Sequence, residues 1–318
     1  MTAYIIRRLI WALGILVLLT LVVFFAMRLL PGDPLQIYVA QSQISNIGPE
    51  ALEQLRIEHG LDKPILVQYF TWISNVLRGD LGRSVFLNDS VGSLIAKRLP
   101  ITAHIGVLAF IVATILGTLS GLLAGLRRGK LADQIVTPFA YVGITLPVFW
   151  LGIILVYIFG LQLKWLPIGG YTSPFEDFWL NTRQLVMPVA CECLLGLASM
   201  SRQMRSSVLE VAQQDYIRTA WSKGLRERAI VFKHMLKNCL IPVVTLMGFA
   251  VSMIFGGSVL VETVFNIPGM GRLMVNSIFN QDYVVVQATT LIFGAIVLFV
   301  NLVVDISYGW LDPRIRYS

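Results

Sequence analysis

Charged residues are scarce in this sequence of 318 residues. They make up 14% of it, whereas hydrophobic residues make up 56% and the mean hydropathy is +0.73. A soluble domain usually carries about 25% charged residues, so this chain has too few of them to cover a surface that faces water. The deficit excludes an ordinary soluble fold and favours a protein that has lipid as its main solvent.

Cysteine and histidine are also rare, with three of each. They are Cys191, Cys193 and Cys239, and His59, His104 and His234. The C-x-C pair has no further cysteine or histidine near it, which is not the pattern of a zinc site, and the H-E-x-x-H motif of metalloproteases is absent. We therefore expect no metal site and no catalytic residues.

A phosphate-binding loop of the G-x-x-x-x-G-K-[ST] type is missing as well. The Gly129-Lys130 pair is followed by Leu131 and lacks a glycine at the required upstream spacing. Without this loop the chain has nothing to hold the phosphates of ATP. We expect no cofactor on this chain and no enzymatic activity of its own, so ATP and Mg, if they are used, would be bound by partner chains.

Long apolar runs are abundant, and a membrane span needs roughly 20 such residues. The first run, Leu9 to Met27, follows Arg7 and Arg8 and has no small-residue cleavage site, which predicts an uncleaved span with a cytoplasmic N-terminus. The other runs are Ile101–Leu126, Ile135–Phe159, Leu185–Met200, Leu240–Val261 and Val284–Ile306. The sequence therefore predicts an all-α membrane protein with six transmembrane helices and both termini in the cytoplasm.

The region between the first two runs is polar and of mixed charge. It predicts a small extracytoplasmic segment with short helices at Pro49–His59 and Ile65–Leu77. The second helix would lie partly on the membrane surface through Tyr69, Phe70 and Trp72. We divide the chain into residues 1–30 (N-terminus and first helix), 31–97 (extracytoplasmic segment), 98–308 (five helices, with a cytoplasmic loop at 202–239) and 309–318 (cytoplasmic tail).

Glycines recur every four residues at Gly117, Gly121 and Gly125. This spacing places them in one stripe along a helix, where a neighbouring helix can approach closely.

The stretch from Arg205 to Pro242 is the longest polar interruption in the C-terminal half, and it is strongly basic. If successive spans cross the membrane in alternating directions from a cytoplasmic N-terminus, Lys and Arg are denser in the segments on the cytoplasmic side. This distribution places the stretch in the cytoplasm. Its pattern predicts a helix from Val208 to Lys223, a joint at Gly224 and a second amphipathic run with Ala229, Phe232 and Leu236 on one side. The stretch can be a positive anchor, a site for anionic lipids or a docking surface for a partner. An apolar patch of Tyr216, Ile217, Ala220 and Trp221 favours docking.

Two acidic positions stand out in the apolar part. Glu192 is the only carboxylate well inside a predicted span, and such a residue should face the bundle interior or an aqueous path. It is either a pathway residue or a buried polar group that bonds between helices. Glu262–Gly271, with Pro268 and Gly269, predicts an extracytoplasmic turn that serves as a gate, a receptor contact or a plain connector.

Several motifs together resemble one known family. DYIRTAWSKGL at Asp215–Leu225 and HMLKNCLIP at His234–Pro242 are similar to the cytoplasmic EAA-type loop of ABC-importer permeases, most closely those of the dipeptide/oligopeptide/nickel (peptide/opine/nickel uptake) group. The order and spacing of further motifs match that group along the whole chain: Pro31–Pro34, Gly79–Ser84, Arg98–Pro100, Glu262–Phe265, Pro268–Gly271, Asn301–Asp305 and Asp312–Arg316. The large segment after the first span resembles the B-type permease subunit.

The resemblance implies an ABC type I importer permease bundle and a bacterial or archaeal cytoplasmic (inner) membrane location. The partners it implies are a second homologous permease subunit, two ATP-binding ATPase subunits, an extracytoplasmic substrate-binding protein and the lipid bilayer, and no nucleic acid. The residues implied in ATPase coupling are Asp215, Tyr216, Arg218, Thr219, Ala220, Trp221, Lys223 and Gly224; those implied in a pathway or gate are Glu192, Glu262, Pro268 and Gly269. Arg218 stands where the general signature has glutamate, so a glutamate-based contact is not carried over.

Two alternatives use different machinery. An ion-coupled secondary transporter would more often show inverted repeats with broken helices, and no convincing repeat is present in this sequence. A channel or membrane receptor would need no cytoplasmic contact with a motor subunit.

Overall fold

The structure, a computed structural model, describes residues 2–29, 49–58 and 60–311. The Pro31–Pro34 motif, His59 and residues 312–318 of the predicted tail lie outside the described residues. The elements are α1 (Thr2–Leu29), α3 (Pro49–Glu58), α4 (Ile65–Leu77), α5 (Val91–Leu126), α6 (Leu131–Thr145), α7 (Val148–Leu155), the π-helix η1 (Val156–Gln162), α8 (Phe178–Val211), α9 (Asp215–Ser222), α10 (Glu227–Ala229), the π-helix η2 (Ile230–Met235), α11 (Leu236–Val264), α12 (Met270–Phe279) and α13 (Tyr283–Leu311). The described residues form no β-strand, which confirms the all-α prediction.

The described residues contain five helices that are long and apolar enough to cross a membrane. A sixth span results if α6 and the α7–η1 segment are counted together, but these two are bent by 106° where they meet. The span predicted over Ile135–Phe159 is therefore sharply bent in the structure. Pro147 explains the break, because a proline disfavours the helical conformation of the residue before it, and Leu146 is extended with φ −72° and ψ 125°.

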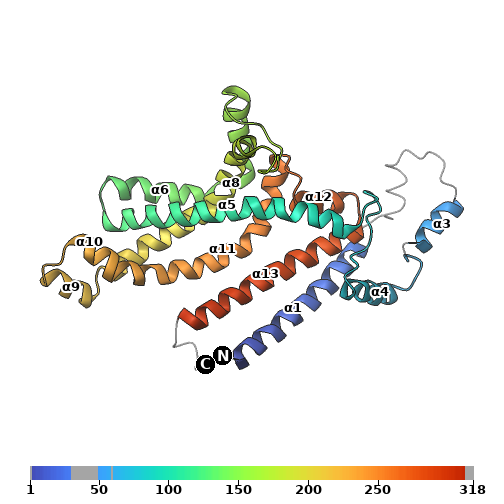
Figure 1. Cartoon of the computed structure of the whole chain (residues 1–318), viewed down its shortest axis with the longest axis horizontal. Coiled ribbons are helices and arrows are strands. Elements are labelled where there is room, and N and C mark those ends of the chain that lie inside the picture. Colours follow the sequence, from blue (N-terminus) through green and yellow to red (C-terminus); the bar gives the residue numbers. More distant parts are fainter. Residues whose placement is uncertain (1, 30–48, 59, 312–318) are drawn as a thin grey trace. The chain divides into compact units, whose positions relative to one another are not determined.

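The chain divides into two compact units, one formed by residues 1–100 and 269–318 and the other by residues 101–268. In the first unit α1 packs along α13, and Figure 1 shows the two helices side by side. Gly294 permits this approach, since a Cβ atom there would collide with the side chain of Leu19. The described part of α1 presents many apolar side chains outward, among them Trp11 and Leu18, as a lipid-facing helix does.

Helix α4 has the predicted bounds but not the predicted surroundings. Tyr69 is buried, its ring lies 5.2 Å from that of Phe24 on α1, and its hydroxyl is 3.0 Å from that of Thr20. Trp72 stacks on Phe24 at 5.8 Å. The prediction that Tyr69 faces the membrane surface is therefore wrong, because packing on α1 buries its ring; Trp72 is half-buried, and Phe70 is 67% exposed.

Helix α8 is the centre of the second unit and packs against α6, α7 and α11. The glycine stripe of α5 also lies on α8, as its spacing predicts. A Cβ atom added at Gly117 would lie 2.8 Å from the carbonyl oxygen of Leu197, and one at Gly121 would collide with the carbonyl oxygen of Ser201. The two backbones therefore meet at distances that only glycine allows.

We expect Gly121→Ala to destabilise the protein by about 1–3 kcal/mol, because the added methyl group has no space against Ser201. Gly14→Ala is the matched control, since a Cβ atom there would meet nothing within 4 Å. Thermal unfolding in detergent measures both. Equal midpoints for the two variants would contradict the close packing of α5 on α8.

Candidate coupling surface and membrane carboxylates

Residues 208–223, predicted as one helix, are divided between the end of α8 and the separate helix α9. Helix α8 ends at Val211, and α9 begins at Asp215. Between them the N–H groups of Gln213 and Gln214 bond three residues back, and Gln214 then adopts an extended conformation with ψ 145°. The predicted continuous helix from Val208 to Lys223 is therefore wrong, because the chain leaves the helical conformation at Gln214 and turns α9 away from α8.

One face of α9 anchors it to the bundle. Ile217 is 1% exposed and Ala220 is 5% exposed, and both belong to an apolar cluster that includes Met204 of α8 and Met235 of η2. The hydroxyl of Tyr216 accepts a hydrogen bond from Asn238 Nδ2 at 2.7 Å, which ties α9 to α11. Figure 1 shows α9 and α10 beyond the ends of α8 and α11 in this unit.

The other face of α9 is open. Tyr216 is 43% exposed and Trp221 is 53% exposed. Arg218 lies 3.6 Å from Asp215 one turn away, and both side chains are largely exposed. Thr219, Lys223 and Gly224 are exposed too. The predicted four-residue apolar patch is thus divided: Ile217 and Ala220 are buried in the core, and two aromatic rings remain at the surface among polar groups.

Gly224 is the joint between α9 and the next helical segment, as predicted. It has φ +71°, which favours glycine, and its N–H bonds to the carbonyl of Trp221 at 2.9 Å. Beyond it, the buried residues are Ile230, Val231 and Met235, whereas Phe232 is 66% exposed. The predicted apolar side with Phe232 is wrong because Ile230–Met235 forms a π-helix, whose wider turn shifts the buried face.

Glu262 lies in the last turn of α11 and is fully buried. Its Oε1 accepts hydrogen bonds from the hydroxyls of Thr102 at 2.5 Å and Ser258 at 2.6 Å. The prediction that Glu262 begins a turn is therefore wrong. The helix continues to Val264 and ends where Asn266 takes φ +53°.

Glu192 lies in α8, and both of its carboxylate oxygens are buried without a hydrogen-bond partner among the described residues. Pro268 and Gly269 form the connector that follows α11, with Pro268 partly exposed and Gly269 buried. The segment after this connector forms α12 over Met270–Phe279.

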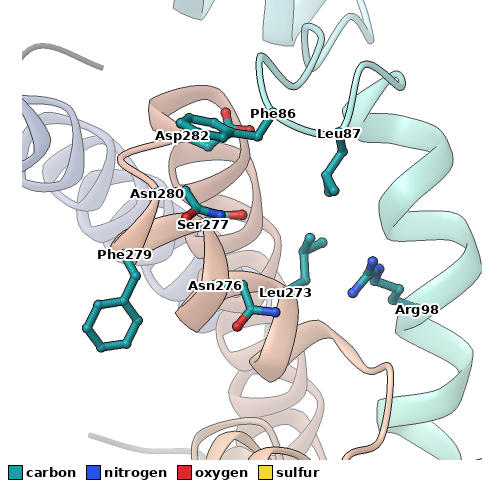
Figure 2. Close-up of a pocket in the computed structure, with 9 residues that line it drawn as sticks. All are labelled: Phe86, Leu87, Arg98, Leu273, Asn276, Ser277, Phe279, Asn280 and Asp282. Carbon is teal, nitrogen blue, oxygen red and sulfur yellow. The ribbon is translucent and has the colours of Figure 1, made fainter. Parts of the chain in front are cut away.

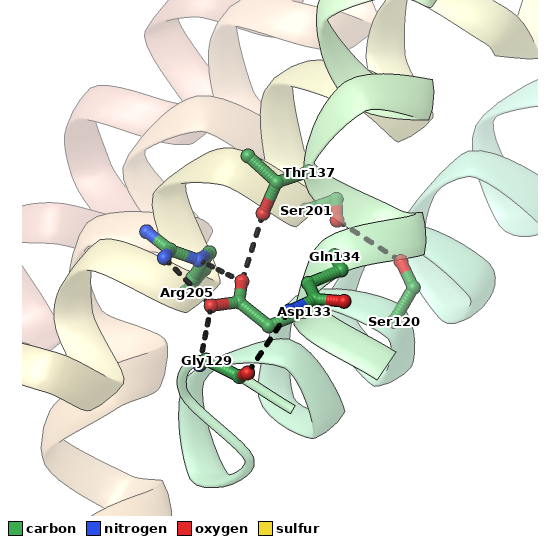
Figure 3. Close-up of polar contacts among 7 residues, drawn as sticks. All are labelled: Ser120, Gly129, Asp133, Gln134, Thr137, Ser201 and Arg205. Carbon is green, nitrogen blue, oxygen red and sulfur yellow. Dashed lines mark hydrogen bonds and ion pairs between the residues drawn. The ribbon is translucent and has the colours of Figure 1, made fainter. Parts of the chain in front are cut away.

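An ion pair that the sequence analysis missed ties α6 to α8. Arg205 Nε lies 2.6 Å from Asp133 Oδ1, and Arg205 Nη2 lies 3.0 Å from Oδ2 (Figure 3). The only sequence signal is a charge at the edge of each apolar run, 72 positions apart. This signal does not predict the pairing, because the pairing depends on how α6 and α8 lie together.

The first unit contains a small pocket of about 200 Å³ (Figure 2). Its lining residues are Phe86, Leu87, Arg98, Leu273, Asn276, Ser277, Phe279, Asn280 and Asp282. The hydroxyl of Ser84 donates to Asp282 Oδ2 at 2.5 Å, and burial raises the pKa of this carboxyl above its usual value although hydrogen bonds oppose the change. Phe279, 80% exposed, is the largest apolar side chain of α12 at the surface.

Comparison with known proteins agrees with these features. Residues 117–317 match the family model described as "Binding-protein-dependent transport system inner membrane component", and residues 1–106 match the model for the N-terminal part of such a membrane component. A putative peptide transport system permease protein of Brucella abortus is 40% identical over 321 residues, covering all of both chains. A probable peptide ABC transporter permease protein of Sinorhizobium fredii is 39% identical, and an oligopeptide transport system permease protein of Bacillus subtilis is 37% identical, each over the full length of both chains.

The match extends over nearly the whole chain, and the described helices supply the expected membrane spans. An ion-coupled secondary transporter or a channel is therefore not favoured. The chain belongs to the family of binding-protein-dependent transport system inner membrane components and is a multi-pass permease subunit of an ABC importer.

Proposed function

We propose that this permease subunit imports peptides. The support is the full-length identity of 37–40% to proteins named as peptide or oligopeptide transport permeases. The chain would form half of the translocation pathway, and a second homologous permease would form the other half. Glu192, Glu262 and the connector with Pro268 and Gly269 are our candidates for pathway or gate residues.

The coupling residues that we propose lie on α9. The observation that carries this proposal is the division of the helix into two faces: Ile217 and Ala220 hold it to the bundle, while Tyr216 and Trp221 remain open. An aromatic ring that is exposed beside basic and acidic groups is typical of a protein interface. We infer that each permease places this face in a cleft of an ATPase subunit, where ATP and Mg are bound and ATP is hydrolysed.

The membrane topology that we propose follows from the distribution of charge and from the alternating direction of successive spans. We propose that both termini and α9 face the cytoplasm, because Lys and Arg are concentrated in the segments on that side. Residues 31–97 and α12 would then be extracytoplasmic, in the inner membrane of a bacterium or archaeon. The pocket beside Arg98 and the exposed ring of Phe279 would lie on the side where a substrate-binding protein docks.

The experiment that tests this function is peptide uptake by the complete complex in proteoliposomes. The complex is purified through this chain with its partner subunits, and a labelled tripeptide is supplied with the binding protein outside and ATP inside. We expect uptake only when both ATP and the binding protein are present. Uptake driven by an ion gradient in the absence of ATP would contradict the proposal and would support a secondary transporter.

A further inference from the structure

Asp133 stands at the centre of a hydrogen-bond network that joins two helices and a turn. Its carboxylate accepts from the N–H of Gly129 at 2.9 Å and from the hydroxyl of Thr137 at 2.9 Å. The guanidinium of Arg205 adds two bonds, at 2.6 and 3.0 Å. Figure 3 shows the carboxylate pointing at Arg205, with Gly129 and Thr137 on either side. We call the pair Asp133–Arg205 the clamp.

The clamp lies at the end of the bundle that carries α9. Arg205 is in the penultimate turn of α8, just before the chain turns into α9. Gly129, with φ +74°, forms the turn between α5 and α6. Because one carboxylate holds this turn, the start of α6 and the end of α8, the end of α8 cannot separate from the other two at this point without breaking the ion pair.

Further contacts make α5 and α8 a closely fitted pair at the same end. The hydroxyl of Ser120 donates to that of Ser201 at 3.1 Å, and a Cβ atom at Gly125 would collide with Val208. The clamp adds α6 to this pair. Helix α6 in turn leads to the 106° bend before α7, so a displacement of α8 would reach α7 through α6.

Stability alone gives a weak reason for this arrangement. Asp133 is nearly buried, with 9% of its side chain exposed, whereas 29% of the Arg205 side chain is exposed. An ion pair that has lost part of its hydration often adds little stability compared with well-packed apolar residues. What a planar guanidinium on a carboxylate does supply is a fixed geometry, because two parallel bonds define both distance and orientation.

We infer that the clamp is a positioning element which makes α5, α6 and α8 move as one body when α9 is displaced. The inference rests on the proposed role of α9 and goes beyond it, because it assigns a function to two residues that lie outside α9 and outside the proposed pathway residues. Asp133 and Arg205 determine how much of a displacement of α9 is transmitted through α5, α6 and α8 to the proposed translocation pathway.

Arg205→Lys tests the clamp, because lysine keeps the charge but loses the two parallel bonds. We expect the complex to assemble and to hydrolyse ATP, while the number of peptides imported per ATP falls at least fivefold. Thr137→Val is the matched control, since it removes one bond to Asp133 and leaves the ion pair, and its ratio should not change. An unchanged ratio in Arg205→Lys would overturn the inference.

A second measurement does not depend on transport. Spin labels at Leu131 on α6 and Ser206 on α8, both exposed, report the distance between the two helices. We expect the same distance with and without ATP in the otherwise unmodified complex, and an ATP-dependent change in Arg205→Lys. A distance that changes on ATP binding without that substitution would overturn the inference even if Arg205→Lys did not assemble. Failure of the unmodified complex to import peptide would instead contradict the proposed function.

Discussion

Trp221→Ala is expected to weaken the contact between the permease and its ATPase subunit about 30-fold and to reduce peptide uptake accordingly. The ring is 53% exposed on α9, next to two side chains that anchor the helix. Truncating an aromatic residue at the centre of an interface costs about 2 kcal/mol or more, which corresponds to roughly 30-fold in affinity. Because Trp221 contributes little to the core, the permease itself should fold and reach the membrane normally.

Trp179→Ala is the matched control for this prediction. Trp179 is 74% exposed on the same helix that leads to α9, but it lies in the first turn of α8, at the opposite end. Co-purification of the ATPase subunits and uptake of a labelled peptide measure both variants. If the two variants lost uptake to the same extent, or if Trp221→Ala retained the ATPase subunits fully, the coupling role of α9 would be wrong.

Glu262→Ala is expected to destabilise the protein by about 2–4 kcal/mol, because it leaves the hydroxyls of Thr102 and Ser258 without their acceptor in a buried site. Glu262→Gln keeps an oxygen in the same place and should preserve most of the stability. Thermal unfolding of the detergent-solubilised permease measures the difference. Equal unfolding midpoints for the alanine and glutamine variants would show that the bond from Thr102 to Glu262 does not hold α11 to α5.

Glu192 provides a contrast within the same measurement. Its oxygens accept no hydrogen bond from the described residues, so Glu192→Met removes a buried carboxylate without breaking a bond. This variant should be as stable as the original protein or more stable. A loss of uptake without a loss of stability would favour the pathway role of Glu192 over that of a buried polar group between helices.

The comparison of sequence and structure shows which features local patterns determine. The bounds of α4, the stripe of Gly117, Gly121 and Gly125, and the joint at Gly224 all follow from residues close together in the chain, and the structure confirms them. Each depends on a periodicity or on the backbone freedom of glycine, which a single segment displays.

The features that the sequence did not predict depend on which segments meet. The bond of Thr102 to Glu262 joins positions 160 apart, and the clamp joins positions 72 apart. Tyr69 was predicted to lie at the membrane surface, because the amphipathic pattern of its helix is the same whether the apolar face meets lipid or packs on another helix such as α1. The bend at Leu146–Pro147 had a local signal in its proline, but membrane helices tolerate proline in both straight and broken forms.

Crosslinking at position 218 tests the central claim most directly. Arg218→Cys places a reactive thiol on the open face of α9 after the three native cysteines, all of which are buried, have been replaced. The account predicts a specific crosslink between this residue and the ATPase subunit, with a yield that changes when ATP binds. No crosslink at position 218, with an efficient one from an exposed position such as Trp179 at the other end of α8, would contradict it.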